Sequence, residues 1–227
     1  MDEIRIRTLE EYTKKIEGHG DTFFYRGVKN INYELIPSAG RFGIKDPTRQ
    51  IQFERALIEE FKRKAPIYLR NLPKDDLEWL ILAQHHGIPT RLMDWSFNPL
   101  IALFFAIENE NDTDCAIYES HRHSGTSAPK TFDEIYSGVE FTPILPTLSI
   151  DRYANQASVF TLEANPTQFN AKWKRRKFII EIKAKESIRW KLRRIGITKS
   201  IIYPSLDSLA YDIVETNKIS YGNNFNK

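Results

Sequence analysis

Apolar residues recur at helical spacing through much of the first half of the chain. Leu9, Tyr12 and Ile16 fall on one face of a short predicted helix, and Thr8 with Glu11 resembles a capping box at its start. Further helical patterns cover four ranges: 47–69, 73–86, 185–195 and 205–214. A helix over 100–109 is apolar on nearly every side, so we expect it to be buried.

Strand patterns dominate the second half. Short apolar or alternating segments predict strands at 22–28, 115–119, 156–163, 178–183 and 200–203, and residues 88–95 are expected to be extended. Residues 120–130 read as an exposed loop, and 131–151 show no clear pattern. Because helices cluster early and strands late, the pattern favours an α+β fold over alternating β and α elements.

Length and composition are those of a soluble globular protein. The 227 residues are 41% hydrophobic, which is enough for one large domain or for one domain with a small appendage. We expect an N-terminal helical segment over 1–21, a main domain over 22–214 and a polar C-terminal tail over 215–227. The apolar runs are too short to span a membrane, and the N-terminus does not have the pattern of a signal peptide. Cys115 is the single cysteine and cannot form an internal disulfide, so a cytoplasmic location is the default expectation.

Positive charge is concentrated near the C-terminal end. The segment Lys172–Lys199 holds 12 Lys and Arg against two Glu, although the whole chain carries a net charge of only +3. Such a segment can contact nucleic acid or phosphate. It can equally be the solvated face of one strand and one helix with Trp173 and Trp190 in the core, and we favour this second interpretation.

Two segments concentrate candidate chemistry. In Tyr25-Arg26-Gly27, an arginine lies at the end of an apolar strand. Its planar guanidinium could bind a phosphate group. Alternatively, it could reach solvent or form a structural ion pair. The segment 84–96 places polar, aromatic and glycine residues before the buried helix. Its consecutive histidines diverge on a helix, so no metal site is expected, and Arg91 with Asp94 could simply pair with each other.

These motifs resemble the FRG domain, a family named for its aromatic-Arg-Gly motif. The resemblance rests on residues 25–27, on 83–96, and on 98–99 with 102–106. It extends to 155–160 and 203–207, and so covers roughly 22–214, the expected main domain. Met93 stands where leucine is usual, and Ala157-Ser158 lies where a glycine is often found. The family is largely without assigned function.

A more distant resemblance is to ADP-ribosyltransferases. These enzymes carry first an Arg or His, then a Ser- or Thr-containing strand before an Ala/Phe-rich helix, and late in the chain a Glu or Gln. This chain has a similar order, with Arg26, then Thr90 to Ser96, then Gln156. The resemblance implies a split, mostly antiparallel sheet, with NAD as the substrate. It also implies catalytic roles for Arg26, Ser96 and Gln156, and dinucleotide binding by seven residues: Tyr25, Arg26, Gly27, Thr90, Arg91, Asp94 and Trp95.

The roles follow the chemistry of glycosyl transfer. Arg26 would hold an NAD phosphate or ribose, Ser96 or Thr90 the nicotinamide ribose, and the ring of Tyr25 or Trp95 would stack on nicotinamide. The amide of Gln156 would stabilise a cationic sugar less well than a carboxylate. Three interpretations therefore stay open: low activity, an unusual acceptor, or binding without turnover. Glu163 is too far along the strand to replace Gln156, while Glu140 or Asp151 could enter the site from elsewhere.

The resemblance therefore implies an ADP-ribosyltransferase-like toxin or antiphage effector that modifies a protein or nucleic-acid acceptor. The alternatives are a non-catalytic module that binds a nucleotide or nucleic acid, and a structural or interaction domain. The transferase hypothesis requires Arg26, Asp94, Trp95 and Gln156 to share one pocket, with a buried helix over 100–106 directly beneath it.

Overall fold

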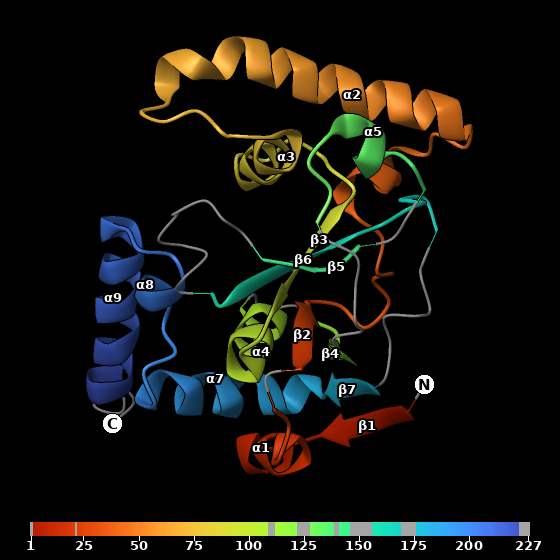
Figure 1. The fold of residues 1–227 in the computed structure, drawn as a ribbon. Coiled ribbons are helices and arrows are strands. Elements are labelled where there is room, and N and C mark those ends of the chain that lie inside the picture. The colour runs from red at the N-terminus through yellow and green to blue at the C-terminus, as the bar shows by residue number, and fades with distance from the viewer. Residues whose placement is uncertain are drawn as a thin grey trace.

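The fold is α+β and is built on one mixed sheet of seven strands. A computed structural model describes residues 2–20, 22–108, 112–121, 128–138, 141–145, 156–168 and 176–222 (Figure 1). The strands are β1 (Asp2–Ile6), β2 (Phe23–Val28), β3 (Leu92–Ser96), β4 (Cys115–His121), β5 (Phe141–Ile144), β6 (Ser158–Leu162) and β7 (Arg176–Ile180). Their spatial order is β1-β7-β4-β2-β3-β6-β5. β1 runs parallel to β7, and every other neighbouring pair is antiparallel.

The helices follow the predicted pattern closely in the first half of the chain. They are α1 (Leu9–Ile16), α2 (Pro47–Lys64), α3 (Asp76–His85), α4 (Pro99–Ile107), α5 (Phe132–Ile135), α7 (Lys185–Arg194), α8 (Lys199–Ile202) and α9 (Leu206–Gly222). Short 3-10 turns lie at Ser38–Phe42, Ala65–Tyr68 and Ile182–Ala184. Thr8 and Asn98 accept hydrogen bonds from backbone N–H groups in the first turns of α1 and α4, which fixes where these two helices begin.

The sheet is split between β2 and β3. Tyr25 opposite Ser96 is the single residue pair in the register of these two strands, whereas β2 pairs with β4 over six residues. The halves β1-β7-β4-β2 and β3-β6-β5 therefore meet at one point and diverge from it. This agrees with the predicted split, mostly antiparallel sheet.

Each half of the sheet has its own cover of helices (Figure 1). Helices α1, α4 and α7 pack on the four-stranded half, around Tyr12, Leu103 and Phe178. Helices α2, α3 and α5 pack on the three-stranded half, with Leu80 and Phe160 in their core. The two groups of helices are therefore separated at the same place as the two halves of the sheet.

Gly27 determines how closely α4 approaches the sheet. A Cβ atom at this position would lie 2.0 Å from the carbonyl oxygen of Ala102 and 2.7 Å from the backbone nitrogen of Ala106. Only glycine permits this contact between β2 and the middle of α4. Ile101 to Phe104 are all buried, which confirms the predicted buried helix.

The structure corrects the prediction for residues 200–203. Residues 200–202 belong to the short helix α8, and Tyr203 follows its end, so no strand forms here. Ile202 is fully buried and Ile201 is 52% exposed, and the backbone N–H of Ser200 donates to the carboxylate of Asp212 over 2.7 Å. The β-branched run suggested a strand, but this cap and the contact with α9 determine the local conformation.

Two other elements differ from the prediction. β1 was not predicted, because its apolar positions Ile4 and Ile6 alternate with charged residues over only five residues. It becomes a strand by pairing with β7. α9 continues to Gly222, past the predicted end at residue 214. In the described parts of the chain, none of the helices combines the length and the apolar character that crossing a membrane requires.

Candidate functional site

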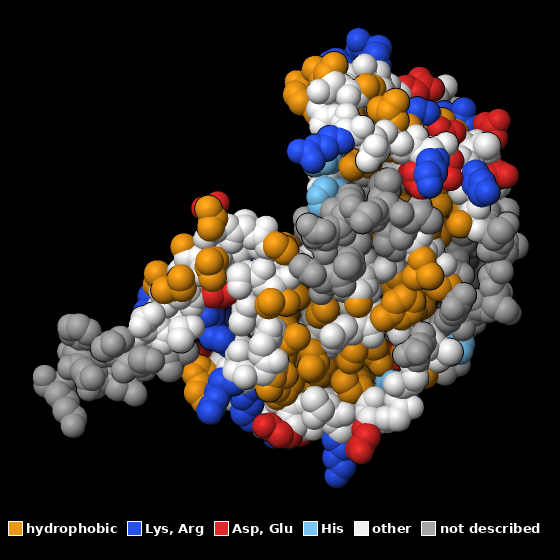
Figure 2. Space-filling model, turned by 60° about the vertical axis from the view of Figure 1, so that its left-hand side comes forward, with side chains coloured by type: hydrophobic (Ala, Val, Ile, Leu, Met, Phe, Trp, Pro, Cys, Tyr) orange, Lys and Arg blue, Asp and Glu red, His pale blue; other side chains and the backbone are white. Residues whose placement is uncertain are grey.

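A pocket of about 270 Å³ lies where the sheet divides. Its walls come from β2, β3 and the start of β6, from the C-terminal ends of α3 and α4, and from the segment that joins α8 to α9. Figure 2 views the molecule from the side of α8 and α9 and shows an indentation between the lobe that carries α2 and α3 and the rest of the protein.

Seven of the predicted site residues line this pocket: Tyr25, Arg26, Gly27, Asp94, Trp95, Ser96 and Gln156. The expected grouping of Arg26, Asp94, Trp95 and Gln156 in one pocket is confirmed. Thr90 and Arg91 do not contribute to its lining.

Arg26 bridges the two diverging strands. Its Nη1 donates to the carbonyl oxygen of Asp94, and its Nε is buried without a hydrogen-bond acceptor among the described residues. Burial lowers the pKa of the guanidinium, and the nearby carboxylate of Asp94 opposes this shift. Asp94 itself is exposed and accepts a hydrogen bond of 2.8 Å from Nε2 of Gln84. The split thus places an incompletely bonded cation beside an accessible carboxylate.

Ser96 and Gln156 are held together on the pocket wall. The Ser96 hydroxyl donates to the backbone oxygen of Gln156 over 2.6 Å and accepts from the Asn98 N–H over 3.0 Å. Gln156 lies in the turn before β6 and not on the strand, and its Nε2 donates to the backbone oxygen of Ile202 over 3.2 Å. Ala157, with φ of 45°, lets the chain enter β6 from this turn. Both side chains therefore already have partners within the fold.

The rings of Tyr25 and Trp95 are not placed to stack on a ligand. Tyr25 is 2% exposed and its hydroxyl lies 2.7 Å from Nδ1 of His19. Trp95 is 3% exposed, and its Nε1 donates to Thr161 Oγ1 over 3.0 Å. Strand alternation directs the two side chains to opposite faces of the sheet, and both faces are packed.

Phe105 and Tyr203 are the half-buried aromatic residues of the pocket. Their ring centroids lie 6.1 Å apart at an interplanar angle of 65°. The sequence analysis does not identify these two residues as site residues. Their positions within the FRG-like segments 102–106 and 203–207 are the signal that could have identified them.

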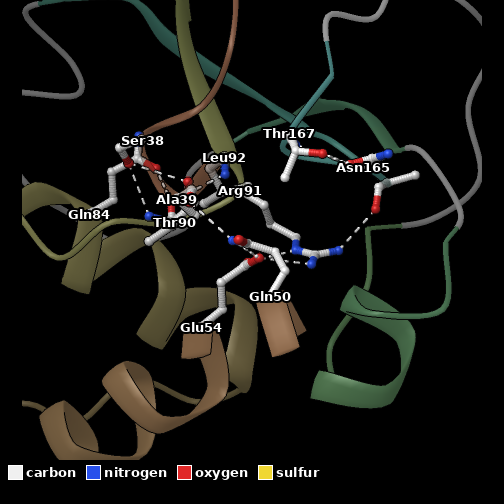
Figure 3. Close-up of polar contacts among 11 residues, drawn as sticks. Ser38, Ala39, Gln50, Glu54, Gln84, Thr90, Arg91, Leu92, Asn165 and Thr167 are labelled. Carbon is white, nitrogen blue, oxygen red and sulfur yellow. Dashed lines mark hydrogen bonds and ion pairs between the residues drawn. The ribbon is translucent and has the colours of Figure 1, made fainter. Parts of the chain in front are cut away.

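Arg91 belongs to a buried network behind the pocket (Figure 3). Its Nε lies 2.8 Å from Glu54 Oε2 and its Nη2 lies 3.0 Å from Glu54 Oε1, while both side chains are 1% exposed. Gln50 donates to the same carboxylate over 2.9 Å. The suggested pairing of Arg91 with Asp94 is therefore wrong, because the guanidinium points into the core beside α2.

Thr90 supports the same wall. Its hydroxyl donates to Oε1 of Gln84, and its backbone oxygen accepts from the Ala39 N–H over 3.1 Å (Figure 3). Because Gln84 in turn holds the Asp94 carboxylate, Thr90 acts on the pocket through that side chain.

A second carboxylate reaches the pocket from the end of α4. Glu108 Oε2 lies 3.2 Å from Lys29 Nζ and accepts a hydrogen bond of 3.3 Å from the Tyr203 hydroxyl. Sequence reasoning missed Glu108, although it follows directly on the apolar helix. Of the other acids considered, Glu163 is buried and accepts from Thr161, while Glu140 and Asp151 lie outside the described residues.

Four of the nine described basic side chains between 176 and 199 have acidic partners: Arg176, Lys177, Lys191 and Arg193. Lys177 lies 3.2 Å from Glu3, and Lys191 lies 2.7 Å from Glu10. For these four residues, the pairing favours the interpretation of a solvated protein face. Trp190 is 38% exposed with Arg194 4.6 Å from its ring, so the expectation that it lies in the core is wrong. Residues 172–175, including Trp173, are outside the described parts of the chain.

Comparison with known proteins identifies one family. Searches of curated proteins and of solved structures give no match. The family model of the FRG domain matches residues 21–115, a segment that runs from β2 to the first residue of β4 and includes Arg26, Asp94, Ser96 and Glu108. The match covers less than half of the chain, and over residues 21–115 it agrees with the expected resemblance to the FRG domain.

Proposed function

We propose that the pocket at the sheet split binds NAD and that the protein is an ADP-ribosyltransferase-like enzyme. One observation carries the proposal. Arg26 on β2, Ser96 on β3 and Gln156 before β6 line a single pocket, although they are far apart in the sequence. Their order along the chain is the one expected from the resemblance to ADP-ribosyltransferases.

The chemistry of the lining suits a nucleotide. The unsatisfied Nε of Arg26 can donate to a phosphate oxygen. The carboxylates of Asp94 and Glu108 can accept hydrogen bonds from ribose hydroxyl groups, and the ring of Phe105 or Tyr203 can contact a planar base. Ligand pockets usually hold about 300–1,000 Å³. At about 270 Å³, this pocket lies just below that range. It would therefore enclose part of a dinucleotide, and the rest would extend out of the open side of the pocket.

Glycosyl transfer needs stabilisation of a developing positive charge on the ribose. Carboxylates provide this better than amides. Asp94 and Glu108 are the carboxylates among the described lining residues, so the negative potential would come from the middle of β3 and from the C-terminal end of α4. Ser96 would act by fixing the Gln156 backbone, to which it donates. If the acceptor were an essential macromolecule, the biological role would be that of a toxin or an antiphage effector.

A non-catalytic nucleotide-binding module is the second candidate. It is favoured by Gln156, whose amide nitrogen is already bonded to the Ile202 backbone oxygen. A residue fixed in this way can shape the pocket without taking part in a reaction.

Calorimetry with NAD and ADP-ribose tests binding, and chromatographic detection of released nicotinamide tests turnover. We expect NAD to bind and Arg26→Gln to weaken binding about tenfold or more, because charge-assisted hydrogen bonds contribute about 1.5–3 kcal/mol. Arg63→Gln is the matched control, since this arginine is 70% exposed on α2 and lies outside the pocket. Binding without nicotinamide release would favour the module. Absence of NAD binding, or equal binding by both variants, would refute the proposal.

A further inference from the structure

A second pocket of about 350 Å³ lies on the other side of the C-terminal end of α4, against α7, α8 and α9. Phe104, Ile107 and Ile197 give it an apolar floor, and Arg189, Arg193 and Lys199 lie around it. We propose that this cationic pocket binds the phosphate group of a small phosphorylated ligand.

Arg189 is incompletely satisfied. Its Nη2 donates to the backbone oxygen of Ile107 over 2.5 Å, which holds the guanidinium at the end of α4. Its Nε is buried and has no hydrogen-bond acceptor among the described residues. A buried donor without a partner costs free energy, and an anion in the pocket would supply the acceptor.

Lys199 adds a second uncompensated charge. Its Nζ lies 4.6 Å from the centre of the Tyr211 ring, and in the described part of the chain it forms no ion pair with a carboxylate. Arg193 differs, because its Nη1 lies 3.3 Å from Asp212 Oδ1 and it also donates to the Asp212 backbone oxygen. Arg193 would therefore help to position an anion while it stays paired with Asp212.

The acidic charge near the pocket does not cancel this excess. Glu108 is the acid among the described lining residues, and it is paired with Lys29 and bonded to the Tyr203 hydroxyl in the first pocket. Arg189 and Lys199 thus leave a local positive charge beside a low-dielectric floor, where an anion is attracted more strongly than at an open surface.

The lining favours phosphate over a simple carboxylate. Planar guanidinium groups and a lysine can engage several oxygens of one phosphate, and the hydroxyls of Thr198 and Tyr211 add further donors. The apolar floor can accept the body of a small ligand. A nucleic acid strand would need a longer basic track, but Lys177 on β7 and Lys191 on α7 are already paired with acids.

The two pockets lie on either side of Glu108, which contributes to both. The anion site does not depend on the proposed NAD chemistry, because its cations come from α7 and α8 and not from the sheet split.

Calorimetric titration with inorganic phosphate and with pyrophosphate tests the site. Acetate at matched ionic strength is the comparison. We expect phosphate and pyrophosphate to bind and acetate to bind at least about tenfold more weakly. Lys199→Gln should weaken pyrophosphate binding about tenfold or more. It is the decisive variant because Lys199 makes no backbone hydrogen bond through its side chain among the described contacts, whereas Arg189→Gln also removes the bond to Ile107.

Lys183→Gln is the control, because it removes an exposed lysine outside the pocket and should leave pyrophosphate affinity unchanged. Equal affinity for phosphate and acetate, unchanged affinity in Lys199→Gln, or an equal loss of affinity in Lys183→Gln would each overturn the proposal.

Discussion

Breaking the buried ion pair between Arg91 and Glu54 should destabilise the protein strongly. In Arg91→Met, the Glu54 carboxylate loses two hydrogen bonds of 2.8 and 3.0 Å and keeps the one from Gln50, yet it stays in a site where its side chain is 1% exposed. Removing one partner of a buried pair costs about 3–5 kcal/mol, because the remaining charge is uncompensated. That is a large fraction of the about 5–15 kcal/mol by which domains are stable.

Urea unfolding monitored by tryptophan fluorescence measures the loss. With a slope of about 2–3 kcal/mol per molar urea, the midpoint should fall by roughly 1–2 M. The double variant Glu54→Leu/Arg91→Met removes both charges and keeps an apolar side chain at each position. It should therefore lose much less stability than the sum of the two single variants.

Arg63→Met is the control for loss of an arginine, because its pairing with Glu60 is exposed and should be worth less than about 1 kcal/mol. The reasoning would be refuted if Arg91→Met cost no more than this control. Strict additivity of Glu54→Leu and Arg91→Met would refute it as well, since it would mean that the two groups do not interact.

Three further predictions concern the walls of the split sheet. Gly27→Ala should lower the melting temperature sharply, because its Cβ would lie 2.0 Å from a backbone oxygen of α4; an unchanged melting temperature contradicts this close packing. Burial raises the pKa of the Cys115 thiol to about 11, so at pH 8 it should resist a thiol reagent until denaturant is added, and rapid labelling of the native protein would contradict it. Burial and Arg176 lower the pKa of His19 despite Glu119 at 3.2 Å. The stability gained from neutral His19 should therefore be complete above its ordinary pKa and be lost as pH falls through the lowered value. His19→Gln should show a smaller drop in melting temperature between pH 7.5 and 5, and an equal drop would count against this assignment.

Local patterns were sufficient to predict the centre of the fold. The strand over 22–28, the helix predicted over 100–109 and the burial of that helix all depend on residues close in sequence. The convergence of Arg26 and Gln156 on one pocket also followed from polar residues that gather at the ends of apolar elements.

Partners distant in sequence could not be predicted. Glu54 lies 37 residues from Arg91 on a helix with no unusual pattern, so the pairing with the nearer Asp94 looked equally good. The direction of the Tyr25 and Trp95 rings depends on which face of each strand is covered, and here both faces are packed. Residues 200–202 became helical through a cap supplied by Asp212, which no local propensity reveals.

The parallel pairing of β1 with β7 has a consequence for how the chain folds. Glu3 stands opposite Lys177, 174 residues later, so this contact closes nearly the whole chain into one loop. Such long-range closure is entropically slow, and during synthesis β1 must wait until β7 has emerged from the ribosome. Until then, the hydrogen-bonding edge of β7 opposite β4 has no neighbour, and an open edge invites pairing with other chains. The few residues of β1 thus act as a late cover for the sheet, and the period before they dock is when this protein is most prone to aggregate.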